Sequence, residues 1–280
     1  MRFAERARGY LDLVRPVNAV AASVLTFIGT FVSAGEIGVR SEVGAAVLAT
    51  LFAVAAGNAI NDYFDRDVDA INDPGRPIPR GAVSPRGTLG FSVALFIGAT
   101  AAALFLPVLA IAIATVNLVA LVAYTEVFKG TPGAGNALVA YLGGSTFLFG
   151  GAAVGNVTPV VVLFALAALS TFTREVIKDV EDFEGDAAEG LTTLPVVIGE
   201  ERALRVAAGV LVVAVLASPM PYLRDTFGLA YLAVVVPADA IMLHAAYAAF
   251  EDPGRGQSVL KYGMFLAAAA FVVGRAAVLV

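Results

Sequence analysis

Two short stretches of the chain carry carboxylates whose spacing suits metal chemistry. In the first stretch, polar side chains recur every three or four residues, which places them on one face of a helix. That face carries Asn58, Asp62, Asp65 and Asp69, with Asn61 at its edge. Asp67 points to the opposite side. Stacked carboxylates repel one another and a bound cation relieves the repulsion, so we interpret the face as a metal site.

The second stretch repeats this pattern further along the chain. Its shared face carries Glu175, Asp179, Asp182 and Asp186. Asp and Asn without His or Cys suit hard ions that prefer oxygen, and Mg²⁺ is the leading candidate. One acidic loop is readily explained as a solvated loop, but two loops with carboxylates in helical register are not. An EF-hand calcium loop is excluded, because Ala70 and Arg76 replace the Gly and the Glu that it requires.

Basic side chains lie among these acids, and a site for a bare cation would not need them. They are Arg76, Arg80, Lys129, Arg174 and Lys178. A metal-bound polyphosphate explains them, because Mg²⁺ bridges carboxylate and phosphate while Arg or Lys takes the remaining phosphate oxygens. The two stretches together therefore predict a polyphosphate site that uses Mg²⁺.

Long apolar segments must position these residues. Of the 280 residues, 59% are hydrophobic and 15% are charged, and the mean hydropathy is +0.84. A membrane-spanning helix needs roughly 20 mostly apolar residues. Nine segments qualify: about 16–34, 44–63, 87–106, 107–126, 135–154, 158–178, 203–221, 227–249 and 259–279. We therefore expect an all-α polytopic membrane protein of one domain, residues 1–280, with acidic loops at about 58–86 and 174–202.

The composition also excludes several classes of protein. A disordered chain or a conventional soluble α/β enzyme would not carry apolar runs of this length. The net charge of −5 and the pI near 4.9 argue against nucleic acid as a partner. Cys is absent, which excludes disulfides, thiolate metal sites and a Cys nucleophile.

The distribution of basic residues predicts the orientation in the membrane. With nine spans, fifteen of the 18 Lys and Arg residues share the side of the N-terminus, leaving Arg40, Arg224 and Arg275 on the other. The positive-inside rule then places the N-terminus and both acidic loops in the cytoplasm, and the C-terminus outside. Spans one to four and five to eight each carry an acidic loop after their second span, which indicates an internal duplication.

These motifs resemble those of the UbiA-type intramembrane prenyltransferases over essentially the whole chain. The matching residues are Arg15-Pro16-x-Asn18, Asn61-Asp62-x-x-Asp65-x-x-x-Asp69, Arg76-Pro77-Ile78-Pro79, Tyr124-x-x-x-x-Lys129, Gly135-Asn136 and Asp182-x-x-x-Asp186. The resemblance implies nine helices around a central cavity open to lipid. It also implies an isoprenyl diphosphate bound through Mg²⁺, with a dry cavity that protects an allylic cation from water. The pairs Gly143-Gly144 and Gly150-Gly151 are then expected at close-packed positions between helices.

The resemblance also implies roles for individual residues. The implied metal ligands are Asp65 and Asp69 for one ion and Asp182 and Asp186 for the other. Asp62 and Asp179 would assist them, and Tyr124 would lie near the allylic carbon. The implied neighbours of the diphosphate are Asn61, Arg76, Lys129, Arg174 and Lys178. The implied lining of the substrate site also includes Arg15, Asn18, Asn58 and Asn136.

The second motif bears on the identity of the acceptor. Its pattern is most similar to archaeal ether-lipid enzymes of the family, which transfer a geranylgeranyl group from geranylgeranyl diphosphate to the sn-2 hydroxyl of geranylgeranylglyceryl phosphate. Arg15 and Arg80 are candidates to bind that acceptor's phosphate. An aromatic or chlorophyllide acceptor is the alternative, since Asn72-x-Pro74-x-Arg76-Pro77 is close to the chlorophyll synthases. Membrane lipids surround the protein in either case, and no obligatory protein partner is evident.

A membrane transporter is the alternative from another class. Transporters place ionisable groups near the middle of the bilayer, and here Asp239 and His244 are the exceptions in an almost uncharged middle. We expect Asp239 to pair with Arg275 in the last span, and His244 to be a structural histidine. The two acidic faces favour the enzyme.

Overall fold

The computed structural model describes residues 3–34, 40–128 and 130–279, and the regular structure of these residues is helical. Within them, one long helix corresponds to each of the predicted apolar segments. These helices are α2 (Pro16–Ala34), α3 (Ser41–Phe64), α5 (Pro85–Ala103), α6 (Val108–Ala123), α7 (Ala134–Ala153), α8 (Val161–Glu181), α11 (Glu200–Ala217), α13 (Leu229–Ala248) and α14 (Pro253–Leu279).

Short helices join the long ones. They are α1 (Phe3–Val14), α4 (Arg66–Asn72), the π-helix η1 (Tyr124–Phe128), the 3-10 helix η2 (Thr158–Val160), α9 (Phe183–Ala188), α10 (Leu194–Ile198) and α12 (Met220–Leu223). Proline opens several helices, because its missing N–H would lack a partner in the first turn. At the start of α5, Pro85 follows Ser84, whose Oγ accepts from the backbone N–H of Gly87 at 3.1 Å.

Seven helical segments of the described residues are long and apolar enough to cross a membrane. The protein is therefore an integral membrane protein with an all-helical fold. Two of the predicted spans fall short by these criteria. Helix α6 has only 16 residues, and α7 is less apolar because its 20 residues include Asn136 and five glycines.

Glycines allow the close approach of neighbouring helices around α7. A Cβ atom on Gly29 of α2 would lie 2.6 Å from the carbonyl oxygen of Phe147, and one on Gly150 would collide with the carbonyl oxygen of Thr26. A Cβ on Gly144 would lie 2.7 Å from the carbonyl oxygen of Phe164 in α8. Real Cβ atoms do not come so close to their neighbours, which confirms the close-packed positions predicted for Gly144, Gly150 and Gly151. Gly143 differs, because a Cβ there would meet Thr171 only at an ordinary contact distance of 3.4 Å.

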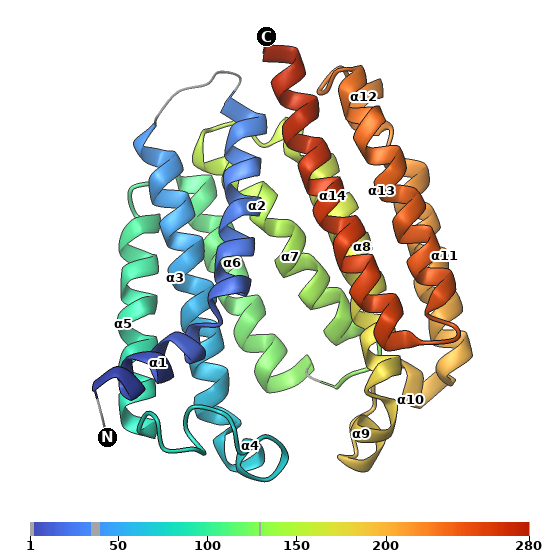
Figure 1. Ribbon diagram of the computed structural model, residues 1–280. Coiled ribbons are helices and arrows are strands. Elements are labelled where there is room, and N and C mark those ends of the chain that lie inside the picture. Colours follow the sequence, from blue (N-terminus) through green and yellow to red (C-terminus); the bar gives the residue numbers. More distant parts are fainter. Residues whose placement is uncertain (1–2, 35–39, 129, 280) are drawn as a thin grey trace.

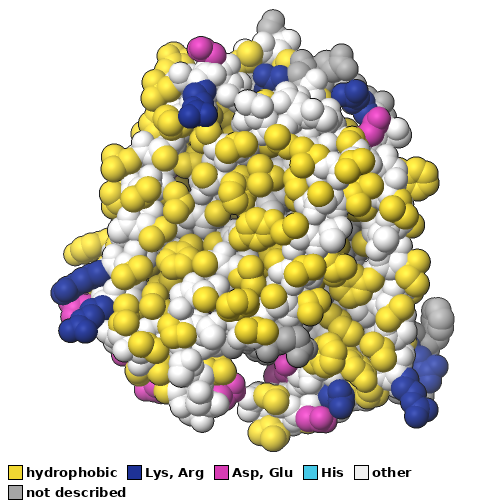
Figure 2. Space-filling view, turned by 180° about the vertical axis from the view of Figure 1, so that it is seen from behind, with side chains coloured by type: hydrophobic (Ala, Val, Ile, Leu, Met, Phe, Trp, Pro, Cys, Tyr) yellow, Lys and Arg dark blue, Asp and Glu magenta, His cyan; other side chains and the backbone are white. Residues whose placement is uncertain are grey.

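Both acidic clusters lie at one end of the molecule. Helices α3 and α8 finish at this end, where α4 and α9 follow them, and α1 lies at the same end (Figure 1). The last helix, α14, finishes at the opposite end. Hydrophobic side chains cover a broad band of the surface, and charged side chains gather towards its two ends (Figure 2). This distribution suits a bundle that spans a bilayer and presents both clusters on one side of it.

Candidate active site

The first cluster lies where α3 ends and α4 begins. The backbone N–H groups of Asp65 and Asp69 donate to carbonyls four residues earlier, both at 2.8 Å, so the helical register continues across the break at Asp65. Asp62 is 2% exposed, Asp65 and Asp69 are half-buried, and Asp67 faces solvent. Burial therefore agrees with the predicted face, whereas the break in the helix is not foreseen by the sequence pattern.

Two arginines converge on the buried carboxylate of Asp62. Arg15 Nη2 lies 2.6 Å and Arg76 Nη1 lies 3.3 Å from Asp62 Oδ1. Arg15 sits between α1 and α2 with φ of 46°, a left-handed conformation that is rare for a residue with a Cβ. Asn58 of α3 holds this junction, because its Nδ2 donates to the carbonyl of Val14 at 3.0 Å. The structure thus brings three predicted substrate-binding residues together around Asp62.

Two oxygens of the first cluster are buried without a hydrogen-bond donor among the described residues. They are Asn61 Oδ1 and Asp62 Oδ2. Buried acceptors without a partner are rare and costly, and a cation or its bound water would satisfy both. Burial also raises the pKa of Asp69 above its ordinary value, although Arg76 opposes that shift. A bound cation would favour the ionised form of Asp69. The donor set therefore fits a hard metal ion.

The second cluster has the same backbone arrangement at the end of α8. Helix α8 ends before Asp182, α9 follows it, and the N–H groups of Asp182 and Asp186 donate to the carbonyls of Lys178 and Asp182 at 2.9 Å each. Asp186 is half-buried, and burial raises its pKa. One turn before the break, Asp179 accepts a hydrogen bond at 2.7 Å from Nδ2 of Asn136, which is buried in α7.

The cations of the second cluster are themselves paired. Lys178 Nζ lies 3.5 Å from Asp182 Oδ2, and both side chains are about half exposed. Arg174 donates from Nη1 to its neighbour Glu175 at 3.0 Å and from Nη2 to Gln257 of α14 at 2.8 Å. Arg174 is thus fixed between α8 and α14, and Lys178 is the more accessible of the two cations.

Three predicted residues do not join this arrangement. Arg80 pairs with Asp12 of α1 and donates to the carbonyl of Gly75 at 2.9 Å. Asn18 is exposed in the first turn of α2. Lys129 lies outside the described residues. The structure therefore ties Arg80 to α1, whereas Arg15 and Arg76 are the arginines that contact Asp62.

The two clusters approach each other across the bundle. Asn72 Nδ2, at the end of α4, donates to Oε1 of Glu189, just after α9, at 3.0 Å. Tyr124 of η1 lies within electrostatic range of Asp65 in the first cluster and of Asp179 and Asp186 in the second. Sequence reasoning missed the bond from Asn72 to Glu189 and the contact of Gln257, because both depend on helix packing and no local pattern signals them.

A metal ion at this site would need ligands beyond those of the protein. In the described part of the chain, no three His, Cys, Asp or Glu side chains come close enough to hold an ion by themselves. Each cluster instead offers carboxylate oxygens at two successive turns, with cations nearby. This arrangement suits an ion shared between protein carboxylates and the oxygens of a bound phosphate.

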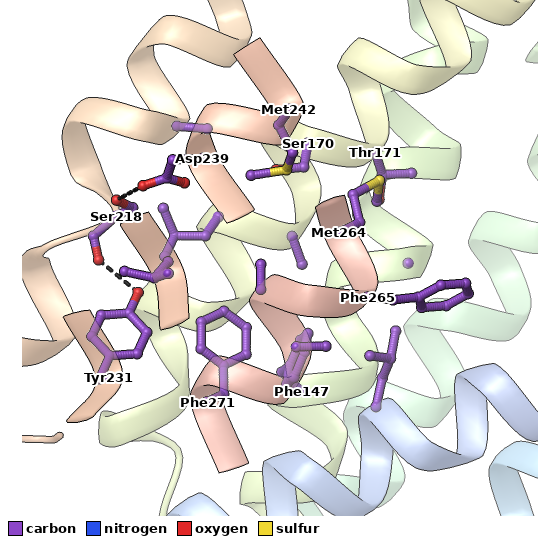
Figure 3. A pocket seen from close by; sticks show the side chains of 18 residues that line it. Phe147, Ser170, Thr171, Ser218, Tyr231, Asp239, Met242, Met264, Phe265 and Phe271 are labelled. Atoms are coloured by element: carbon purple, nitrogen blue, oxygen red, sulfur yellow. Dashed lines mark hydrogen bonds between the residues drawn. The ribbon is translucent and has the colours of Figure 1, made fainter. Parts of the chain in front are cut away.

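An apolar pocket of about 120 Å³ lies deeper in the bundle, lined mainly by α8, α13 and α14 (Figure 3). Its aromatic lining consists of Phe147, Tyr231, Phe265 and Phe271. On its edge, Ser218 Oγ donates to Asp239 Oδ2 at 2.6 Å, and Tyr231 donates to the carbonyl of Ser218 at 2.7 Å. The predicted pairing of Asp239 with Arg275 is wrong: Asp239 binds Ser218, and Nε of Arg275 has no partner among the described residues.

Fold and site together define a class of protein. Two facing carboxylate clusters with associated cations lie at the surface end of a membrane bundle, and apolar space lies behind them. Such a protein handles an amphiphile with an anionic head and an apolar tail. The sequence profile of the UbiA prenyltransferase family matches residues 22–269, so the chain belongs to this family and is a prenyltransferase.

Individual relatives show which members of the family the chain is similar to. A digeranylgeranylglyceryl phosphate synthase of Natronomonas pharaonis is 65% identical over 275 residues, which cover 98% of this chain and 99% of the relative. One of Methanopyrus kandleri is 44% identical over 95% of this chain and 98% of the relative. A solved structure from work on digeranylgeranylglyceryl phosphate synthase has a TM-score of 0.84 at 36% identity, covering 97% of this chain and 99% of that chain.

A more distant structure bears on ligands of the fold. A UbiA homologue of Archaeoglobus fulgidus was solved with GPP and Mg²⁺, and it matches with a TM-score of 0.73 over 97% of this chain and 100% of that one. At 22% identity, this likeness concerns the fold alone. It establishes that a protein of this fold binds a prenyl diphosphate together with Mg²⁺.

Proposed function

We propose that the protein has digeranylgeranylglyceryl phosphate synthase activity. It transfers a geranylgeranyl group from geranylgeranyl diphosphate to the sn-2 hydroxyl of geranylgeranylglyceryl phosphate, a step of archaeal ether-lipid synthesis. The observation that carries the proposal is the 65% identity, over nearly the full length of both chains, to a synthase of that name. The paired acidic clusters supply the chemistry that the reaction requires.

The diphosphate of the donor binds between the two clusters. Asp65 and Asp69 would hold one Mg²⁺ ion and Asp182 and Asp186 another, and both ions would bind the diphosphate. This assignment is supported by the unpartnered buried oxygens beside Asp65 and by the bond from Asn72 to Glu189 that joins the two sides.

Charge then explains how the prenyl group is released. Mg²⁺ bound at this site would neutralise the diphosphate and make it a better leaving group. Lys178 and Arg174 offset the negative charge that grows on the departing pyrophosphate. Tyr124 lies between the clusters, next to the path of the allylic carbon, and the surrounding helices exclude water. The sn-2 oxygen bonds to C1 of the prenyl group as the C1–O bond breaks, and the products are the ether, pyrophosphate and a proton.

The apolar pocket suits the far end of a C20 chain. Thr171 lines it eleven residues before Asp182 in α8, which is about 16 Å along the helix. An extended geranylgeranyl chain spans about 18 Å, at close to 1.2 Å per bond. With the diphosphate at the clusters, the last isoprene unit therefore reaches the pocket.

The topology proposed for the chain follows from its charges. All nine long helices cross the membrane, including the short α6 and the glycine-rich α7, so that the N-terminus and both clusters face the cytoplasm. The C-terminus then lies outside. Accessibility of single cysteines, introduced at exposed positions of α4 and α12, would test this orientation in intact cells.

A transfer assay with purified protein in detergent tests the activity. Radiolabelled geranylgeranyl diphosphate and Mg²⁺ are supplied with geranylgeranylglyceryl phosphate, 4-hydroxybenzoate or chlorophyllide. We expect product with the glyceryl phosphate alone, pyrophosphate release in equal amount, and loss of both in EDTA. Transfer to the aromatic acid or to chlorophyllide instead would overturn the acceptor. Movement of a prenyl lipid across vesicles without pyrophosphate release would support a transporter.

A further inference from the structure

We propose that Arg15 and Arg76, positioned by Asp62, bind the phosphate of the acceptor lipid. The proposal rests on the proposed activity, because it needs an acceptor that is a phosphomonoester. It separates two anion subsites: the carboxylate clusters take the donor diphosphate through Mg²⁺, and the arginine pair takes the acceptor phosphate directly.

The charges around Asp62 leave the arginines available for an anion. Both guanidinium groups contact the same oxygen, Oδ1, although Asp62 carries a single negative charge and is 2% exposed. Arg15 and Arg76 are 36% and 33% exposed, so part of each side chain remains accessible to an anion. Asp73 also contacts Arg76 Nε at 3.1 Å, but this acid is 58% exposed and screened by water. A guanidinium has five N–H donors in a planar fork that matches phosphate oxygens.

The two oxygens of Asp62 point in different directions and serve different neighbours. Oδ1 accepts from the arginines, while Oδ2 is buried without a donor among the described residues, as is Oδ1 of Asn61. A metal ion held by the cluster, or its bound water, would satisfy Oδ2. Asp62 thus stands between the metal site and the arginine pair, and it is a positioning residue for the pair.

The junction that carries Arg15 is held firmly despite its strained backbone. Asn58 binds the carbonyl of Val14 at 3.0 Å, Arg80 pairs with Asp12, and Tyr10 packs edge-on against Phe91 with ring centroids 4.9 Å apart. A non-glycine residue persists in the left-handed region when its surroundings fix it, and such residues gather at binding sites. Arg80 is used to hold the junction, which leaves Arg15 for the ligand.

The position of the pair suits a lipid phosphate. In Figure 1, α1 and α9 lie on either side of α4, at the end of the bundle that carries the clusters. Arg15 lies between α1 and α2, directly after the last residue of α1, whereas the second cluster lies where α8 meets α9. An acceptor lipid presents its phosphate at the membrane surface, where α1 lies. The donor diphosphate between the clusters and the acceptor phosphate at Arg15 would therefore flank Asp62.

Steady-state kinetics of Arg15→Gln and Arg76→Gln tests the pair. We expect KM for geranylgeranylglyceryl phosphate to rise about tenfold or more, because each change removes charged hydrogen bonds to phosphate. We expect kcat and the KM for the donor to change less than about twofold. Arg66→Gln is the matched control: Arg66 has a similar exposure of 35%, and it contacts the carbonyl of Tyr63 and Asp67 instead.

A second acceptor without phosphate isolates the contact. Geranylgeranylglycerol is offered as acceptor or, if it is not turned over, as a competitor whose inhibition constant is measured. Arg15→Gln, Arg76→Gln and Asp62→Asn should each reduce the preference of the enzyme for the phosphorylated lipid, and Asp67→Asn should not. A merely structural role of Asp62 would lower binding of both lipids equally.

The outcomes separate this proposal from the activity itself. A rise of the donor KM with an unchanged acceptor KM would assign the arginines to the diphosphate and overturn the proposal. Equal losses of kcat for both lipids would overturn it in favour of a structural role. If Asp62→Asn does not fold, the two arginine variants decide. Absence of transfer to the phosphorylated lipid by the wild-type protein would instead overturn the proposed activity.

Discussion

The two acidic clusters have the same backbone arrangement, a long helix followed by a short one. They differ in what binds the carboxylate one turn before the long helix ends. In each, a long helix ends at an aspartate, Asp65 or Asp182, and a short helix carries another aspartate four residues later, Asp69 or Asp186. In the first cluster the preceding carboxylate, Asp62, binds two arginines. In the second, Asp179 binds the neutral amide of Asn136.

This difference indicates that both halves of the chain serve one common function, and that the first half serves an additional one. The paired aspartates at the breaks suit one kind of ion on both sides of the site, which fits the internal duplication expected from the sequence. The arginine pair gives the first half a second anion-binding function. The amide gives the second half a carboxylate that is held in place without added charge.

The largest effect should come from the aspartates that the clusters share. Asp65→Asn and Asp182→Asn should each lower the transfer rate about 10³-fold, because each removes a charge that holds the metal at the departing diphosphate. Asp67→Asn, on the opposite face, should stay within about threefold of wild type. Transfer rates at saturating substrates, with thermal unfolding in detergent as the folding control, make the comparison. Equal losses in all three variants would contradict the assignment of the metal-binding face.

The next effect concerns stability and should differ between the clusters. Asp62→Asn should lower the free energy of unfolding by about 1–2 kcal/mol, because two partly buried guanidinium groups lose their counter-charge. Asp179→Asn should cost less than about 0.5 kcal/mol, since the new amide oxygen still accepts from Asn136. Thermal unfolding of both variants measures the contrast. Similar shifts would mean that the charges around Asp62 do not stabilise the fold.

The sequence predicts the elements and the faces of the clusters for simple physical reasons. A bilayer requires about 20 apolar residues for each crossing, and every predicted segment overlaps one long helix of the described residues. The period of 3.6 residues separates Asp67 from Asp62, and the structure exposes the first and buries the second. Patterns of this kind depend on neighbours along the chain.

Other features depend on contacts between distant segments, and the sequence does not reveal them. Arg80 is drawn to Asp12 although it lies 68 residues away, and Asp239 binds Ser218 although Arg275 offers the opposite charge. The breaks at Asp65 and Asp182 are also missed, because a one-residue departure from helical geometry has no signature in the spacing of carboxylates. Residue types therefore indicate that a site exists, but helix packing determines which side chains belong to it.

A smaller effect should come from the hydrogen bond that joins the clusters. Asn72→Ala removes the donor to Glu189, so α4 and α9 lose a direct link at the end of the bundle. We expect KM for the donor diphosphate to rise about twofold to fivefold, since an exposed neutral-to-charged bond contributes little more. Glu184→Gln, on the exposed surface of α9, is the control. Unchanged kinetics in Asn72→Ala would show that the clusters are held together by packing alone.

The smallest expected difference is in the stability cost of replacing two glycines, which lie in loops near the clusters, by alanine. Gly81, after the first cluster, and Gly130, which accepts hydrogen bonds from Thr192 after the second, both have φ of +75°. A Cβ on Gly81 would meet nothing within 4 Å, whereas one on Gly130 would lie 2.8 Å from a methyl carbon of Leu191. Alanine should cost about 1 kcal/mol of backbone strain at either position. Gly130→Ala should cost up to about 1 kcal/mol more, because Leu191 must shift. Thermal unfolding of both variants isolates the contact, and a Gly81→Ala variant that is the less stable of the two would contradict the tighter packing of the second loop.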